Sequence, residues 1–244
     1  MRKAFNMEDR GILVVGSMNV DMVVKTSRIP SPGETLLGGV FQKFEGGKGA
    51  NQAVAANAIC RGAHFCAGIG DDSFGREYLS YLRGRGIDVS LVKTFSDCAT
   101  GVALITVAAD GQNAITVAPG ANMMLSESDM EGIDFSKFSH ALFQLENDLS
   151  TVARGLKLAR KAGCETVLTP APAKILPEEM LPDIDYIVPN EIEILQIVPE
   201  CSGAESAAQK LISSGVRNVI VTLGKRGCDL YNGCLLYPSP SPRD

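Results

Sequence analysis

The sequence predicts an α/β protein with a mostly parallel sheet flanked by helices and a small β-sheet attached to it. From Ser139 onward, short apolar runs typical of buried strands alternate with helical patterns. Strands and helices alternating at this spacing imply right-handed βαβ crossovers and therefore a parallel sheet. In the first half, a β-hairpin pattern interrupts this order. Apolar residues make up 45% of the 244, enough for one large domain over 1–244.

The first half contains both strand-like and helical segments. Short apolar runs indicate strands, and the Ala-rich segment and a polar cap indicate helices. The expected elements are a buried strand at Ile12–Val15, an extended run at 22–24, a helix over 50–59, a strand at 65–69 and a helix from its cap Ser73 to about Arg83.

A hairpin is expected between Gly101 and Ala118. Two apolar, β-branched runs flank Asp110-Gly111, a dipeptide that favours a tight turn. Together with the extended stretch at 22–45, this hairpin forms the predicted small β-sheet, which we expect to act as a lid.

In the second half, predicted strands and helices alternate regularly until the last residues of the sequence, which fit neither pattern. The expected elements are strands at 141–145, 166–168, 186–188 and 218–222, with helices over 150–162, from about Glu191, and over 204–214. Asn232-Gly233 predicts a hairpin turn after 228–231. In the tail, 235–244, three prolines alternate with serines, so we expect neither a strand nor a helix there.

Composition excludes several classes of function. The net charge is −5 and no Lys/Arg cluster occurs, which argues against nucleic acid or an anionic membrane as partner. Two distant histidines and seven cysteines without a C-x-x-C pair argue against a zinc site, a Ser-His-Asp hydrolase and a disulfide framework. Because Met1–Arg10 has no apolar signal region and no run is long enough to span a bilayer, we expect a cytoplasmic protein.

Polar residues follow several predicted strands. Ligands of open parallel sheets bind beyond the carboxyl ends of the strands, and carboxylates and carboxamides there suit a polyhydroxylated ligand. The residues are Asn19, Asp21, Glu146, Asn190, Glu193 and the segment Thr222–Gly227. Each alone is more often a turn former or helix cap. Asn190 and Glu193 also fit a capping box, and Glu146 fits a solvated turn.

The loop Gly46-Gly-Lys-Gly-Ala-Asn51 is a stronger signal. Its glycines let the backbone approach a ligand closely, and the helix behind it offers free N–H groups. It is not a P-loop, because Gln42 and Gly49 stand where that motif needs Gly and Ser or Thr. A dinucleotide fingerprint fails as well, since Ser73 replaces the third glycine after Gly68-Ile-Gly70. A tight turn with close helix packing explains the glycines but not Lys48 and Asn51.

Residues Gly46–Ala55, GGKGANQAVA, resemble the first signature of the ribokinase (phosphofructokinase-B) family of sugar kinases, and within it the ribokinases. Further segments fall where that family has similar ones, so that the likeness spans about Gly11 to Gly233. They are Gly16–Asp21, Pro32–Thr35, Gly70–Gly75, Pro189–Glu193 and Thr222–Gly227. The resemblance implies a ribokinase-like fold with a β-sheet lid.

The resemblance also implies roles for individual residues. It assigns the sugar to Asn19, Asp21, Gly47, Lys48, Gly49, Asn51 and Glu146. It assigns ATP to Asn190, Thr222, Gly224, Lys225 and Gly227, and Mg²⁺, largely through water, to Glu193. The implied reaction transfers the γ-phosphoryl group of ATP to the 5-hydroxyl of ribose, and the lid implies a homodimer.

One family feature is missing from the sequence. The family's second signature, a Gly-Ala-Gly-Asp turn that carries the catalytic base and lies near a K⁺ site, does not occur before Asp244. We therefore expect a domain that is incomplete at its C-terminus, with no catalytic base in this chain and little turnover. Two alternatives stay open: another sugar or nucleoside kinase of the family, and a non-catalytic sugar-binding remnant. The failed fingerprint disfavours a dinucleotide-dependent oxidoreductase.

Overall fold

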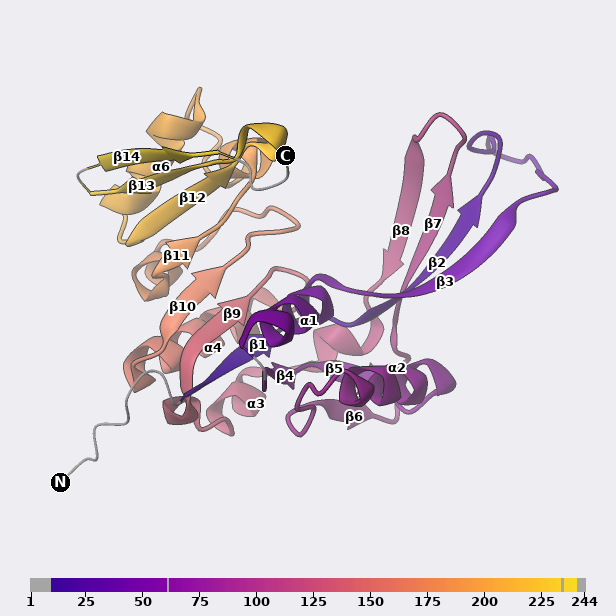
Figure 1. The fold of residues 1–244 in the computed structure, drawn as a ribbon, viewed down its shortest axis with the longest axis horizontal. Coiled ribbons are helices and arrows are strands. Elements are labelled where there is room, and N and C mark those ends of the chain that lie inside the picture. Colours follow the sequence, from indigo (N-terminus) through magenta and orange to yellow (C-terminus); the bar gives the residue numbers. More distant parts are fainter. Residues whose placement is uncertain (1–9, 61, 234, 241–244) are drawn as a thin grey trace. The chain divides into compact units, whose positions relative to one another are not determined.

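The computed structural model describes residues 10–60, 62–233 and 235–240. The chain divides into two compact units (Figure 1). Unit 1 is formed by the described residues of Met1–Val15 and Ser126–Asp244, and unit 2 is Gly16–Leu125. The predicted α/β fold is confirmed: a mostly parallel sheet with helices, together with a smaller lid-like sheet.

Unit 1 is built on a sheet whose strands lie in the order β14-β13-β12-β11-β10-β9-β1. Strands β1, β9, β10, β11 and β12 are parallel to one another, so their carboxyl ends meet at one edge. Their bounds are β1 (Gly11–Val15), β9 (Phe138–Phe143), β10 (Glu165–Leu168), β11 (Tyr186–Ile187) and β12 (Asn218–Thr222). The antiparallel strands β13 (Cys228–Asn232) and β14 (Leu235–Ser239) complete this side of the sheet.

The tail prediction was wrong at residues 235–239, which form β14, and residues 241–244 lie outside the described part of the chain. Among the described strands, β14 pairs only with β13 and lies at the end of the sheet. Proline lacks an N–H group, but an edge strand has one side that needs no ladder hydrogen bonds, so Pro238 is tolerated opposite Asp229. The hairpin predicted at Asn232-Gly233 connects the two strands.

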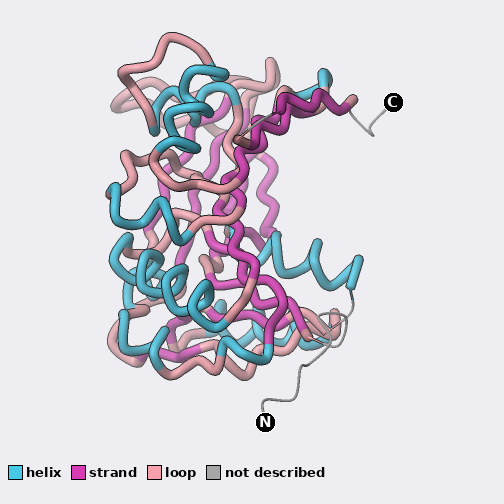
Figure 2. The backbone as a smooth tube through the Cα atoms, turned by 90° about the vertical axis from the view of Figure 1, so that its left-hand side faces the viewer, coloured by secondary structure: helices cyan, strands magenta, loops and turns pink. Residues whose placement is uncertain are grey.

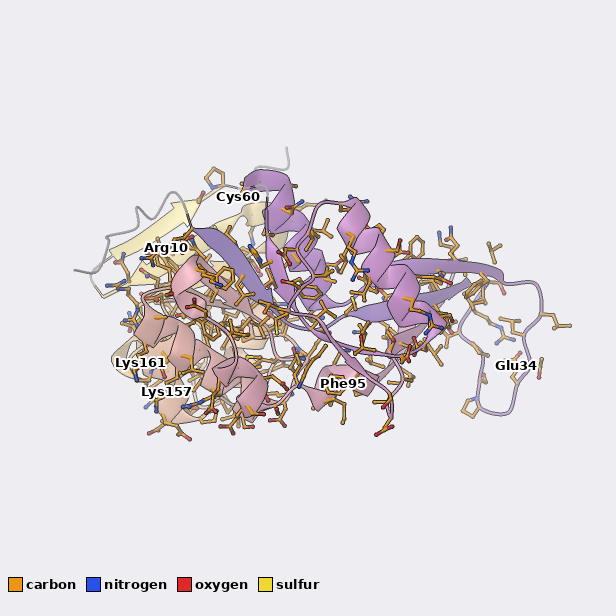
Figure 3. All side chains as sticks on the ribbon, turned by 90° about the horizontal axis from the view of Figure 1, so that it is seen from below. Arg10, Glu34, Cys60, Phe95, Lys157 and Lys161 are labelled. Atoms are coloured by element: carbon orange, nitrogen blue, oxygen red, sulfur yellow. The ribbon has the colours of Figure 1, made fainter. Side chains whose placement is uncertain are left out.

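Helices of unit 1 lie beside its strands (Figure 2). In α4 (Leu149–Ala162), buried residues recur at helical spacing, among them Val152, Leu156 and Ala159. Exposed Lys157 and Lys161 lie on the other side of this helix (Figure 3). The remaining helices are α3 (Glu127–Glu131), α5 (Glu191–Ile197), α6 (Ala204–Ser213) and the 3₁₀ turns η3 (Phe135–Lys137), η4 (Glu178–Asp183) and η5 (Gly224–Arg226).

Unit 2 contains the lid, a sheet with strand order β3-β2-β7-β8. Its strands are β2 (Asn19–Lys25), β3 (Val40–Gly46), β7 (Gly101–Val107) and β8 (Asn113–Ala118). The predicted hairpin is formed by β7 and β8, with Gly111 at a φ of 89° in its turn. Strand β2 pairs antiparallel with β3 and parallel with β7.

The rest of unit 2 corrects two expectations. The single strand expected at 65–69 is two short strands, β4 (His64–Cys66) and β5 (Gly68–Gly70). At Gly68 a Cβ would come within 2.2 Å of the Ala121 carbonyl oxygen, so β5 runs close to the backbone of Ala121. Strand β5 pairs with β6 (Lys93–Phe95). The second helix, α2 (Ser73–Gly84), is capped by Asp72, not by Ser73, because the Asp72 side chain accepts from Gly75 N.

Two remaining elements complete the fold of unit 2. Helix α1 (Lys48–Cys60) contains the predicted Ala-rich helix, and the 3₁₀ turn η2 (Gly120–Met124) follows the lid. Within the described part of the chain, no helix is long and apolar enough to cross a membrane.

Candidate functional site

In unit 2, the glycine-rich loop lies against the start of β2. Ladder pairing sets Asn19 opposite Gly46, the last residue of β3, and α1 begins within the predicted loop, at Lys48, so that only Gly47 separates strand and helix. Ala50 N donates to Ser17 O at 2.9 Å, which ties the first turn of α1 to the segment before β2. Six of the predicted sugar residues therefore lie in one region of unit 2: Asn19, Asp21, Gly47, Lys48, Gly49 and Asn51.

Close backbone contact explains the glycines of this loop. Gly47 has a φ of 91°, and a Cβ there would lie 2.7 Å from Asn19 N. A Cβ on Gly49 would lie 2.5 Å from Ser17 N. Tight packing was the structural alternative for these glycines, and the structure supports it. Lys48 and Asn51 lie in the first turn of α1, which this packing holds against the segment before β2.

Two residues of this region were missed by the sequence prediction. The buried hydroxyl of Tyr78, on α2, donates to the Gly46 carbonyl oxygen at 2.5 Å. Burial raises the pKa of Tyr78 far above its ordinary value, and the charges of Asp21 and Glu45 add to the effect. The buried carboxamide of Asn122, in η2, donates to Asn19 Oδ1 at 2.7 Å. No local pattern signals either contact, because the partners are 32 and 103 residues apart in the chain.

In unit 1, Asn190 and Glu193 form the capping box that their spacing predicts. Asn190 Oδ1 accepts from Ile192 N at 2.9 Å and from Glu193 N at 2.8 Å. Glu193 Oε2 accepts in return from Asn190 N at 2.9 Å. This arrangement holds the Glu193 carboxylate at the start of α5, next to the end of β11.

The loop after β12 lies beside this cap. Thr222 pairs with Asn190 in a parallel bridge, and its N–H donates to Pro189 O at 2.9 Å. Gly224 and Gly227 have φ values of 59° and 95°, and a hydrogen bond of 2.8 Å from Leu223 N to Gly227 O closes the loop. The structure thus groups all predicted nucleotide residues in one place in unit 1: Asn190, Thr222, Gly224, Lys225 and Gly227.

Glu146 belongs to unit 1 and lies three residues after β9, whereas the other predicted sugar residues are in unit 2. Its side chain is half-buried. The segment before it is fixed by two hydrogen bonds of 3.1 Å, from Leu145 N to Ala171 O and from Lys174 Nζ to Leu145 O. The region that holds Glu146 is therefore an ordered strand end.

Within residues 10–60, 62–233 and 235–240, no group of three His, Cys, Asp or Glu side chains is placed to hold a metal ion. The described cysteines are all free thiols.

Comparison with known proteins gives a consistent assignment. A family model described as pfkB family carbohydrate kinase matches residues 9–243. The ribokinase of Haemophilus influenzae is 40% identical over 223 residues, which cover 88% of this chain and 72% of that protein. The deoxyribokinase of Salmonella typhi is 37% identical over 223 residues, covering 88% of this chain and 73% of that protein.

A solved structure is similar over almost the whole chain. The structure of Arabidopsis thaliana ribokinase complexed with ribose and ATP matches with a TM-score of 0.85 and 30% sequence identity. The match covers 95% of this chain and 78% of the plant protein.

Proposed function

The chain belongs to the pfkB family of carbohydrate kinases, and we propose that its substrates are ribose and ATP. The reaction transfers the γ-phosphoryl group to the 5-hydroxyl of ribose and yields ribose 5-phosphate. One observation carries this proposal: the glycine-rich loop, Asn19 and Asp21 lie together in unit 2, in a chain 40% identical to a ribokinase.

The proposed sugar site uses polar groups of complementary kind. The carboxylate of Asp21 accepts hydrogen bonds, and Asn19 and Asn51 carry carboxamides that donate and accept. Lys48 adds a positive charge at the beginning of α1. The loop glycines, Gly47 and Gly49, allow the backbone to come close to a bound sugar. The family resemblance assigns a further carboxylate to the sugar, that of Glu146, which lies in unit 1 after β9.

The proposed nucleotide site uses the loop after β12 and the cap of α5. Asn190 is assigned to the phosphates, and Thr222, Gly224, Lys225 and Gly227 line the nucleotide pocket. Phosphoryl transfer requires positioning and neutralisation of charge more than covalent chemistry by the protein. Lys225 is exposed and has a flexible amine, which fits a contact with phosphate.

Mg²⁺ would supply charge neutralisation on the ATP phosphates. Mg²⁺ at ATP sites is usually held by phosphate oxygens, water and one or two carboxylates. Glu193 is the carboxylate that we assign to that water shell, at a position fixed by its bond to Asn190 N. No described residue is assigned to K⁺ or to the catalytic base.

We also propose that the lid mediates a homodimer. Its strands carry a set of exposed apolar side chains that is unusual for a surface in contact with water alone. They are Val24, Val40, Phe41, Phe44, Leu104, Ile115 and Val117. Sedimentation equilibrium tests this proposal: Phe41→Lys should convert a dimer into a monomer, and a wild-type monomer at high concentration would refute it.

Isothermal titration calorimetry tests the substrate proposal, because it measures the binding of each candidate substrate directly and needs no turnover. We expect the chain to bind ribose more tightly than fructose or adenosine, and to bind ATP but not NAD. Deoxyribose is the second candidate, since the Salmonella typhi deoxyribokinase is almost as similar to this chain as the ribokinase. Tighter binding of deoxyribose than of ribose would favour that candidate, and preference for a nucleoside would overturn both.

A further inference from the structure

The carboxamide of Asn122 is almost fully buried, with 1% of its surface exposed, and it contacts the start of β2. Its Oδ1 accepts from Met18 N at 2.8 Å. Its Nδ2 lies 2.9 Å from Pro119 O, 3.2 Å from Met18 O and 2.7 Å from Asn19 Oδ1. We propose that Asn122 is a positioning residue that fixes which end of the Asn19 carboxamide faces the sugar.

The orientation of Asn122 follows from backbone groups that cannot change their polarity. The N–H of Met18 can only donate, so the atom that faces it must be the oxygen of Asn122. The carbonyls of Met18 and Pro119 can only accept, so the atom near them must be the nitrogen. A flipped Asn122 would bring oxygen against two oxygens and nitrogen against an N–H.

The orientation of the Asn122 carboxamide in turn determines the orientation of the Asn19 carboxamide. Because Nδ2 of Asn122 donates, the atom of Asn19 that faces it must be Oδ1, and Nδ2 of Asn19 must point the other way. Within the described residues, Nδ2 of Asn19 makes no hydrogen bond of its own. The orientation is therefore set by one contact, with Asn122.

Gly101 keeps space for this contact. A Cβ on Gly101 would come within 2.2 Å of Asn19 Oδ1 and 2.4 Å of Asn122 Nδ2. The pair is thus enclosed by backbone on the side of β7, and Asn19 is only 4% exposed. A side chain so enclosed has few other rotamers available.

The fixed orientation of the Asn19 carboxamide matters for the binding of the sugar, and this inference rests on the proposed function. Asn19 and Asp21 are two residues apart on β2, so both side chains lie on the same face. The carboxylate of Asp21 only accepts, whereas the fixed Nδ2 of Asn19 only donates. A sugar hydroxyl both donates and accepts a hydrogen bond. Such a hydroxyl can therefore donate to the Asp21 carboxylate and accept from Nδ2 of Asn19.

The substitution Asn122→Asp tests the inference, because it keeps the shape and replaces the donor by an acceptor. Asn19 should then turn its nitrogen toward residue 122 and its oxygen toward the sugar, next to the Asp21 carboxylate. We expect the affinity for ribose to fall roughly tenfold or more, the cost of an unmatched polar pair. The affinity for ATP, bound by unit 1, should stay unchanged, as should ribose binding by the control Asn57→Asp. Asn57 is another carboxamide of unit 2 that bonds backbone groups, namely Arg85 O and Gly62 N.

A double-mutant cycle separates positioning from a merely structural role. In the background Asn19→Ala, Asn122→Asp should have no further effect on ribose affinity, because its only route to the sugar is gone. An effect of the same size in that background would overturn the inference, as would unchanged ribose affinity in the single variant. If Asn122→Asp does not fold, Asn122→Ala in the same cycle gives the same decision. A wild-type chain that binds ATP but no sugar overturns the proposed function and this inference with it.

Discussion

The carboxylate of Asp21 lies directly over the α-carbon of Gly46. A Cβ built on Gly46 would approach Asp21 Oδ2 to 2.2 Å, closer than any real contact of that kind. The two residues belong to paired strands, β2 and β3, immediately before the glycine-rich loop. Position 46 therefore controls where the Asp21 carboxylate can lie.

The first prediction concerns Gly46→Ala. The added methyl group must displace the Asp21 side chain, and we expect ribose affinity to fall roughly tenfold or more with the loss of a charged hydrogen bond. Calorimetry measures the change. The matched control is Gly84→Ala, also in unit 2, where a Cβ meets nothing within 4 Å. Equal ribose affinity in both variants would show that Asp21 does not bind the sugar.

The second prediction separates the two roles of Glu193. Because a capping box accepts Gln as well as Glu, Glu193→Gln should leave the free energy of unfolding within about 0.5 kcal/mol of wild type. The loss of charge should nevertheless weaken ATP binding in the presence of Mg²⁺ and leave ATP binding in EDTA unchanged. Asn190→Ala, which removes the cap, should cost about 1 kcal/mol of stability. If Glu193→Gln binds Mg²⁺-ATP normally, Glu193 is a cap alone.

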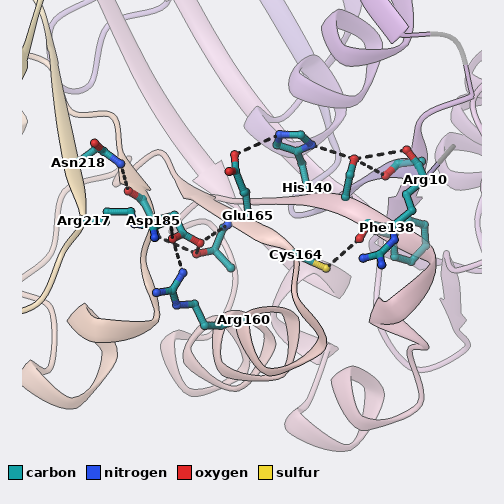
Figure 4. A network of polar contacts seen from close by, with 12 residues as sticks. Arg10, Phe138, His140, Arg160, Cys164, Glu165, Asp185, Arg217 and Asn218 are labelled. Atoms are coloured by element: carbon teal, nitrogen blue, oxygen red, sulfur yellow. Dashed lines mark hydrogen bonds and ion pairs between the residues drawn. The ribbon is translucent and has the colours of Figure 1, made fainter. Parts of the chain in front are cut away.

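The third prediction concerns a buried carboxylate to which no role in binding is assigned. Asp185, 0% exposed, accepts from Thr166 N at 3.0 Å and contacts Arg160 and Arg217 (Figure 4). Because Asp185→Asn leaves Arg160 without its counter-charge, we expect a loss of about 3 kcal/mol in urea unfolding. Arg217→Met should cost at most about 1 kcal/mol, since the Arg217 side chain is 62% exposed and its bond to Asp185 is longer, 3.3 Å. Similar costs for the two variants would contradict this account.

The fourth prediction concerns acid stability. Burial would by itself raise the pKa of Asp72, but hydrogen bonds from Thr100 and Gly75 outweigh burial and lower the pKa. A carboxyl whose pKa is lower in the folded chain stabilises the fold above its unfolded pKa, about 3.9, and loses this contribution as the pH falls through the folded pKa. The stability difference between wild type and Asp72→Asn should therefore be constant from pH 7 to about pH 5 and shrink below about pH 4. A difference that does not change with pH would contradict the prediction.

Local patterns predicted most of the fold. The Ala-rich helix after Lys48, the hairpin around Gly111 and the alternation from Ser139 onward depend on neighbouring residues, and the structure contains all three. One wrong prediction involves a contact between distant segments, because the strand at 65–69 is split where Gly68 meets the Ala121 backbone. Another, β14, pairs with its neighbour in sequence, β13, and was missed because the prolines of the tail argued against a strand.

Some residues of the candidate site were identified from the sequence, and others were missed. Motifs identified the glycine-rich loop and the capping box of Asn190 and Glu193, because their residues are adjacent in sequence. Tyr78 and Asn122 were missed because their roles exist only through distant partners, Gly46 and Asn19.

Calorimetric titration of ribose into wild type and Asp21→Asn tests the central claim most directly. The account predicts that wild type binds one ribose per chain and that Asp21→Asn weakens this binding roughly tenfold or more. It also predicts that both proteins bind ATP equally well. Equal ribose affinity in the two proteins, or no ribose binding by a folded wild type that binds ATP, would contradict it.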